Sequence, residues 1–333
     1  MKKFFLMAAA VLILSVGSVY FTFGPREEEK TEEDFESKIV LGFAQLGDES
    51  EWRSASSTSI KSAARRHGVE LMFENAQQKQ ENQIKAIRSF IAHRVDVIAF
   101  SPVVETGWDN ILLEAKEAGI PVVLVDRRIR TENDGLYVTY IGSDFVEEGR
   151  KAGRWLTDNF PGDGDARIVE LRGTDGSSPA RERAAGFREA ISGDGRFKIV
   201  RSLTADFMRS KGREAMETIL SDYHSPPERS IDVLFAHNDD MAMGAIESME
   251  ERGLTPGTDV IVISVDAQKS ALAALKQGRM NCVVECTPYV GDQLMETAKS
   301  LASGGEVPPW IYSEEAVFTR SDAEAELLPE RAY

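Results

Sequence analysis

Several chemical motifs are absent from the 333-residue sequence. It has no G-x-S-x-G nucleophile elbow, no P-loop and no H-E-x-x-H zinc motif, which mark hydrolases, nucleotide-binding proteins and metalloproteases. The four histidines are scattered without metal-ligand spacing, and the two cysteines, Cys282 and Cys286, fall in one expected strand. Their Cα atoms would lie roughly 13 Å apart, beyond the reach of a disulfide. We therefore expect free thiols, no metal, no cofactor and no enzymatic activity.

Positive charge is also scarce. The chain carries 39 Lys and Arg residues against 55 Asp and Glu residues, a formal net charge of −16. This balance argues against nucleic acid as a partner, because a polyanion is bound by a basic surface. Hydrophobic residues make up 42% and charged residues 28% of the chain, as in packed globular proteins. The length is sufficient for two domains of ordinary size.

The longest hydrophobic run lies at the start of the chain. Residues 4–23 are almost entirely apolar and follow Lys2 and Lys3. About 20 such residues can span a bilayer, and a small-residue cleavage site is arguable near residues 15–18. Residues 1–24 are therefore expected to be either an export signal or a retained N-terminal membrane anchor. The acid-rich residues 25–37 predict a solvated linker, and the charge pattern places the rest outside the cytoplasm.

From residue 38 onward, short apolar runs alternate with amphipathic stretches. The segments 38–45 and 69–74 have the composition of buried strands, whereas 54–68 and 77–94 have helical periodicity. This alternation continues to the end of the chain and predicts βαβ units with parallel, doubly wound sheets. The sequence predicts more strands than a single doubly wound sheet usually contains. We therefore expect an α/β protein with two lobes, each built on its own parallel sheet.

Polar and aromatic side chains gather where the expected strands end. Ligands of open α/β sheets bind outside the carboxyl ends of the strands, so these positions are informative. Carboxylates and guanidinium groups can hydrogen-bond sugar hydroxyls, and aromatic planes can stack on the C–H faces of a sugar ring. The residues concerned are Trp52, Arg53, Asp126, Arg127, Asn238 and Asp266, with Arg183 and Phe207 in comparable loops.

Other interpretations of these residues stay open. Trp52 could be a core residue, and Asp126 with Arg127 could be a structural ion pair. Asp126 and Asp266 could also form a glycosidase-like carboxylate pair. Their Arg and Asn neighbours are expected to keep both carboxylates ionised, which favours binding of hydroxyl groups over catalysis.

Five motifs, in order along the chain, resemble a known family. They are "QQKQENQIKAIRSFIA", "PVVETGW", "VLVDRRI", "ADFMRSKG" and "AHNDDMAMGAI". From residue 38 onward the chain resembles the periplasmic sugar-binding proteins of ABC transporters, in the ribose/galactose class, and its galactofuranose-binding members above all. The resemblance implies the type I periplasmic-binding-protein fold, with two lobes joined by a three-strand hinge. It implies an N-terminal lobe of residues 38–142 plus about 286–312, and a C-terminal lobe of 143–285 plus about 313–333.

The resemblance also implies the ligand-binding residues. Trp52 and Arg53 match the aromatic and arginine after the first strand, and Phe207 matches an aromatic on the opposite face of the sugar. Glu285 stands about where ribose-binding members have a glutamine. The full set is Ser50, Trp52, Arg53, Asp126, Arg127, Arg183, Phe207, Asn238, Asp266 and Glu285. The chain departs from the family pattern at two places: it has "DRRI" where relatives have "DRSI", and it lacks the usual glycine after Asp266. These departures leave the identity of the bound sugar open.

The implied function is capture of a monosaccharide, galactofuranose or a related sugar, and its delivery to ABC-transporter permease subunits. The protein would be exported to the periplasm or the outer membrane face and would act as a monomer, touching the membrane only through an N-terminal anchor. The alternative is a sugar-sensing protein coupled to a sensor kinase or chemoreceptor. A sugar-responsive repressor is disfavoured, because such proteins begin with a helix-turn-helix and this chain begins with an apolar run.

Overall fold

The computed structural model describes residues 38–133, 135–222, 231–322 and 333. The expected export segment (1–24) and acidic linker (25–37) lie outside these residues. Ile39–Tyr333 form one compact unit. Within the described ranges, no helix has the length and apolar character needed to cross a membrane.

The strands of the described ranges form two six-stranded sheets. The first contains, in spatial order, β11 (Trp310–Tyr312), β5 (Thr139–Gly142), β4 (Val122–Val125), β3 (Val97–Phe100), β1 (Val40–Gln45) and β2 (Glu70–Asn75). The second contains β12 (Val317–Phe318), β10 (Cys282–Glu285), β9 (Ile261–Asp266), β8 (Val233–Ala236), β6 (Ala166–Arg172) and β7 (Phe197–Thr204). Neighbouring strands run parallel, except that β12 is antiparallel to β10. Most central strands are buried along their whole length, as expected when helices cover both faces of a sheet.

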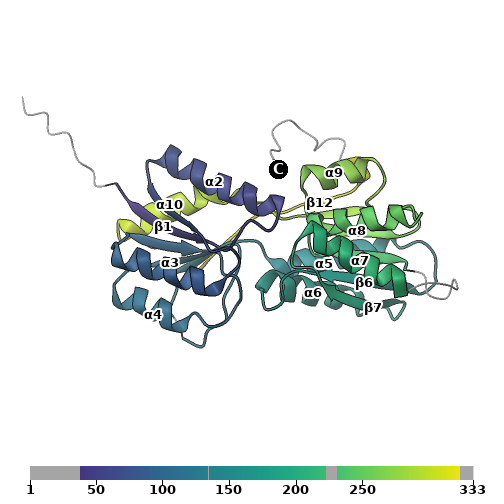
Figure 1. Ribbon diagram of the computed structural model, residues 1–333, viewed down its shortest axis with the longest axis horizontal. Coiled ribbons are helices and arrows are strands. Elements are labelled where there is room, and N and C mark those ends of the chain that lie inside the picture. The colour runs from purple at the N-terminus through teal and green to yellow at the C-terminus, as the bar shows by residue number, and fades with distance from the viewer. Residues whose placement is uncertain (1–37, 134, 223–230, 323–332) are drawn as a thin grey trace, which may run out of the picture. The chain divides into compact units, whose positions relative to one another are not determined.

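Helices cover both faces of each sheet and bury two apolar layers per sheet. In the first lobe, α2 (Glu51–His67) and α10 (Gly291–Ala302) pack on one face, and α3 (Gln80–Ala92) and α4 (Asp109–Glu117) on the other. In the second lobe, α5 (Phe145–Asn159) and α6 (Ser178–Ile191) oppose α7 (Arg209–Asp222), α8 (Asp239–Glu251) and α9 (Lys269–Lys276). Figure 1 shows α10, coloured yellow, beside the purple α2, so segments far apart in the sequence complete one lobe.

Within its described residues, the chain passes between the two sheets three times. It leaves the first sheet after β5 and enters α5 through Ser143 and the helix-capping Asp144. It returns from β10 to α10 through residues 286–290, and it leaves again between β11 and β12 through residues 313–316. These three crossings are the only connections between the sheets among the described residues, and they bring Ser143, Cys286 and Glu315 close together.

Local signals at the start of α2 decide where Trp52 and Arg53 lie. Ser50 has an extended backbone and its hydroxyl accepts a hydrogen bond from Arg53 N at 3.2 Å, so it caps the helix. Gly68 ends the helix with a φ of 69°, a left-handed conformation that suits glycine. Because the helix begins at Glu51, Trp52 and Arg53 occupy its first turn and are held more rigidly than loop residues.

Candidate functional site

A cavity lies at the carboxyl ends of the strands of both sheets. About 290 Å³ of its space is not filled by protein atoms, open solvent included. The first lobe contributes Glu49, Ser50, Trp52, Arg53, Asp126 and Arg127; the second contributes Pro179, Arg183, Phe207, Asn238 and Asp266; and Cys286 comes from a crossing. This is the position at which open α/β sheets bind ligands.

Two arginines and two carboxylates form the charged wall of the first lobe. Arg53 Nη2 lies 2.7 Å from Asp126 Oδ2, and Arg53 Nε lies 3.1 Å from Glu49 Oε1. Arg127 Nη2 lies 3.4 Å from the same Glu49 oxygen. Burial lowers the pKa of Arg53, but Asp126 and Glu49 more than offset this and the pKa lies above its usual value. Burial, with repulsion from Arg53, lowers the pKa of Arg127 to about 10, so both guanidinium groups stay charged at neutral pH.

Asp126 is held in place by its backbone as well as by its partners. Its φ is 64°, and its amide donates to Ile141 O at 2.8 Å. Asp and Asn tolerate this left-handed region better than other non-glycine residues. The carboxylate also accepts a hydrogen bond from Ser101 Oγ at 3.1 Å. The turn after β4 therefore presents a fixed acceptor to the cavity.

Arg183 is the central cation of the second lobe. Its Nε lies 2.6 Å from Glu148 Oε2, and its Nη1 donates to His237 O at 2.6 Å. Its Nη2 lies 3.9 Å from Asp266 Oδ1. Burial lowers the pKa of Arg183, but Glu148 chiefly reverses this and leaves the pKa above its usual value. Arg183 is thus a charged donor fixed on three sides.

Close packing of α5 against α6 makes the Glu148–Arg183 contact possible. A Cβ atom on Gly149 would lie 2.2 Å from Arg183 O, and one on Gly186 would lie 1.9 Å from Val146 O. Real side chains do not approach backbone so closely, so only glycine fits at these two positions. The glycines let the two helix backbones touch, and Glu148 therefore reaches Arg183 without leaving the core.

Asp266 differs from expectation in its ionisation. Burial raises its pKa well above the usual value, and this effect outweighs the attraction of Arg183. The prediction that neighbouring groups keep this carboxyl ionised considered the arginine but not the burial. A protonated Asp266 can donate a hydrogen bond as well as accept one.

Two aromatic side chains face the cavity from opposite lobes. Trp52 and Phe207 are each 5% exposed. Trp52 Nε1 donates to Cys286 O at 2.7 Å, which fixes the indole against a crossing. Asn238 caps α8 by accepting from Met241 N at 3.0 Å, and its Nδ2 donates to Phe207 O at 3.2 Å. Asn238 therefore orients the loop that carries Phe207.

The structure brings together all the predicted site residues except Glu285. Glu285 is the last residue of β10, and its carboxylate accepts a hydrogen bond from Ala316 N at 3.1 Å. The next residue, Cys286, lines the cavity instead. Successive side chains of a strand point to opposite faces, so a one-residue difference decides which of the two meets the cavity.

Three lining residues were not predicted: Glu49, Pro179 and Cys286. Glu49 lies in an acidic loop whose sequence does not reveal its contacts with two arginines. Cys286 was expected to be an incidental free thiol. It is free, as expected, but it is also buried and lines the cavity. Trp108 was left out of the predicted site, and it packs on Phe100 in the core with ring centroids 4.9 Å apart.

Two α/β sheets, three chain crossings and a buried polar cavity between strand ends define the class of two-lobed solute-binding proteins. The family model for the periplasmic binding protein domain matches residues 41–306, and the chain belongs to this family. Its fold is the type I periplasmic-binding-protein fold, as predicted. The family consists of binding proteins, so the chain is not an enzyme, and membership implies an extracytoplasmic location.

Individual relatives are similar over most of their length. The galactofuranose-binding protein YtfQ of Escherichia coli (strain K12) is 42% identical over 270 residues, which cover 81% of this chain and 84% of that protein. A Mycobacterium smegmatis structure in complex with beta-D-fucofuranose is 49% identical, with a TM-score of 0.84 over 88% of this chain and 95% of that chain. The binding-protein component of the arabinose ABC transporter from Shewanella sp. ANA-3, bound to L-arabinofuranose, is 44% identical, with a TM-score of 0.83 over 87% and 94%.

Proposed function

We propose that the chain captures a monosaccharide in its five-membered-ring form, galactofuranose or a related sugar, and delivers it to the permease subunits of an ABC transporter. The observation that carries this proposal is the cavity, where fixed cations, carboxyl groups and two aromatic faces meet from both lobes. Such a site suits a ligand with many hydroxyl groups and little apolar surface.

The relatives support the furanose ring. The three similar proteins are named for, or contain, galactofuranose, fucofuranose and arabinofuranose. These sugars differ in their substituents and share the ring size. The arabinose relative is a component of an ABC transporter, which favours transport over the sensor-coupled alternative.

We assign the site residues roles that follow from their chemistry. Asp126 accepts hydrogen bonds from ring hydroxyls, and Arg127 and Arg183 donate from opposite lobes. Trp52 and Phe207 stack on the two faces of the ring, while Arg53 donates at a position where a second aromatic would favour a six-membered ring. Ser50, Asn238 and Asp266 complete the polar contacts.

Sugars locked in one ring form test the proposal. We expect methyl galactofuranoside and methyl arabinofuranoside to raise the melting temperature of the protein, because a ligand that binds only the folded state stabilises it. Methyl galactopyranoside, which has the same number of hydroxyl groups on a six-membered ring, should cause a much smaller shift. Equal shifts for both galactosides would contradict the furanose proposal, and no shift with any sugar would contradict the class of ligand.

The transport role has a separate test. Deleting the gene should abolish high-affinity uptake of the radiolabelled sugar that binds in the first test, and restoring the gene should recover uptake. Unchanged uptake together with a lost transcriptional response to that sugar would instead support the sensing alternative.

Replacing Trp52 with phenylalanine should weaken sugar binding only moderately. The variant keeps an aromatic plane but loses the indole donor to Cys286 O. A neutral hydrogen bond contributes about 0.5–1.5 kcal/mol, so affinity should fall about twofold to tenfold. Trp52→Leu keeps an apolar side chain without a stacking plane and should bind more weakly than Trp52→Phe. Calorimetry that ranks the two variants in the reverse order would contradict the stacking role.

A further inference from the structure

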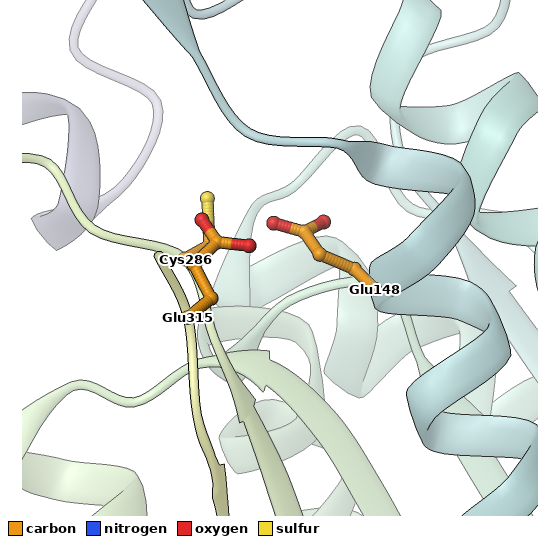
Figure 2. A group of neighbouring side chains, drawn as sticks. All are labelled: Glu148, Cys286 and Glu315. Atoms are coloured by element: carbon orange, nitrogen blue, oxygen red, sulfur yellow. The ribbon is translucent and has the colours of Figure 1, made fainter. Parts of the chain in front are cut away.

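The three crossings between the lobes meet at a small polar cluster beside the cavity. Ser143 belongs to the first crossing, Cys286 to the second and Glu315 to the third, and Glu148 extends toward them from α5. One ligand atom from each of Glu148, Cys286 and Glu315 lies within 4.8 Å of the other two. Figure 2 shows the carboxyl groups of Glu148 and Glu315 facing each other, with the Cys286 sulfur beside them.

If both glutamates of this cluster are ionised, one of their carboxylate oxygens has no hydrogen-bond donor. Glu148 Oε2 is paired with Arg183 Nε at 2.6 Å, but Glu148 Oε1 is buried and receives no hydrogen bond from an ordinary donor. Glu315 Oε1 accepts from the Ser143 hydroxyl. Two neighbouring carboxylates, of which Glu148 is fully buried and Glu315 partly buried, cannot both stay charged at low cost. A single proton between them satisfies Glu148 Oε1 and removes the repulsion.

We propose that Glu315 carries this proton and donates it to Glu148 Oε1, so that Glu315 is a positioning residue that holds Arg183 in the cavity through Glu148. The chain of contacts then runs from the third crossing through α5 to the cation of the second lobe. The proposal rests on the proposed function only where sugar affinity is the readout, because the proton and its effect on stability exist without sugar.

The surroundings of Glu315 agree with a neutral carboxyl group. Burial, followed by the charge of Glu148, raises the pKa of Glu315 to about 9, against opposing contributions from Ser143 and Arg183. Other titratable groups nearby are Cys286, whose thiol has a pKa raised well above its usual value by burial, and Lys151, whose Nζ donates to the backbone oxygen of Glu315 at 2.6 Å. Neither places a full positive charge on the Glu315 carboxyl group.

Further charges face the cluster from the second sheet. Asp266 on β9 lies on the far side of Arg183, and Glu285 on β10 contacts the backbone next to Glu315. Neither side chain supplies a cation that would stabilise an ionised Glu315 carboxylate. A cation bound by Glu148, Cys286 and Glu315 is the competing interpretation, but the Arg183 guanidinium already neutralises Glu148 and would repel a metal ion.

The direction of the pH effect follows from the raised pKa. In the unfolded chain Glu315 ionises near its ordinary value of 4.5, whereas in the folded protein it ionises near 9. Its contribution to stability is therefore complete below about pH 4.5 and is lost progressively as the pH rises to about 9, by at most roughly tenfold in the folding equilibrium constant per pH unit. Above that pH the contribution is constant.

The variant Glu315→Gln tests the role of the ionisable proton, because glutamine has nearly the same shape as glutamic acid but does not titrate. In Glu315→Gln the amide can donate to Glu148 Oε1 and its oxygen can accept from Ser143 at every pH. The test measures chemical unfolding of the full chain without sugar between pH 4.5 and pH 10, for the parent, Glu315→Gln and Glu315→Ala. We expect the parent to lose stability relative to Glu315→Gln as the pH rises, and Glu315→Ala to be less stable than Glu315→Gln throughout.

The neighbouring exposed residue Glu314 provides a matched control, because Glu314→Gln removes the same charge outside the cluster. It should follow the parent profile. If the stability of the parent and of Glu315→Gln depended on pH in the same way, the proposal would be overturned. It would also be overturned if adding EDTA removed the pH-dependent difference between them, because that would indicate a bound cation. With sugar present, Glu315→Ala should bind at least several-fold more weakly and Glu315→Gln about as tightly as the parent at pH 7. A protein that binds no sugar would contradict the proposed function and leave the sugar-free comparison intact.

Discussion

Replacing Asp126 with alanine should weaken sugar binding by at least about tenfold to a hundredfold. Hydrogen bonds to a charged group contribute about 1.5–3 kcal/mol each, and this range corresponds to those factors. The carboxylate is also the partner of Arg53, with Oδ2 2.7 Å from Nη2. Without it Arg53 keeps Glu49 and the Ser101 hydroxyl as partners, so the variant loses an acceptor for the sugar and the strongest constraint on a donor. Calorimetry against the sugar identified in the ring-form test measures the loss.

Two further substitutions distinguish the effect of losing the Asp126 charge from the effect of backbone strain at this position. Asp126 has a φ of 64°, so alanine also introduces strain in a left-handed conformation, of about 1–2 kcal/mol. Asp126→Gly removes the carboxylate without this strain and should bind as weakly as Asp126→Ala. Asp126→Asn keeps both the shape and the tolerated conformation and should lie between the parent and these variants. Parent-like affinity in Asp126→Gly would show that the site is misplaced.

Replacing Arg183 with methionine should lower both stability and sugar affinity. The Arg183 side chain is 4% exposed and that of Glu148 is fully buried, so the substitution leaves a buried carboxylate without its counter-charge. Breaking a buried pair in this way costs about 3–5 kcal/mol, which denaturant unfolding at pH 7 can measure. Affinity should fall at least about a hundredfold, because the cation that faces the ligand from the second lobe is lost.

The double variant Arg183→Met with Glu148→Gln distinguishes these two effects. Removing both charges together leaves no unpaired ion in the core, so most of the lost stability should return. Sugar binding should not return, because the donor is still missing. A double variant as unstable as Arg183→Met alone would show that the stability loss comes from packing. Restored binding would show that Arg183 does not contact the sugar.

Much of the fold was predictable because its pattern is local. Apolar runs of four to eight residues and helical stretches alternate without a break, and this order predicts parallel sheets. The stretch 77–94 was expected to be a helix and contains α3 (Gln80–Ala92). Because ligands bind at the carboxyl ends of such strands, Asp126, Arg127 and Asn238 could be placed near a site from their positions alone.

The remaining site residues depend on contacts that no local pattern encodes. Glu148 is buried in α5 and its partner is Arg183 on the next helix; the sequence shows an ordinary acidic residue near a helix start, where carboxylates are common. Glu285 was placed in the site because it stands about where ribose-binding relatives have a glutamine. The cavity is lined instead by the next residue, Cys286, because successive side chains point to opposite faces of a strand. The raised pKa of Asp266 likewise requires knowledge of its burial.

The three crossings also constrain the order in which the chain can fold. The first sheet begins with β1 and β2, yet one of its edges is formed by β11 (Trp310–Tyr312), and one of its faces is covered by α10 (Gly291–Ala302). Until these late segments have been synthesised, the first lobe has an unpaired strand edge at β5 and an uncovered apolar face around Ile60 and Val123. Such non-local contacts slow folding. The first lobe must therefore remain incomplete for most of synthesis, which is compatible with a chain that crosses a membrane before it folds.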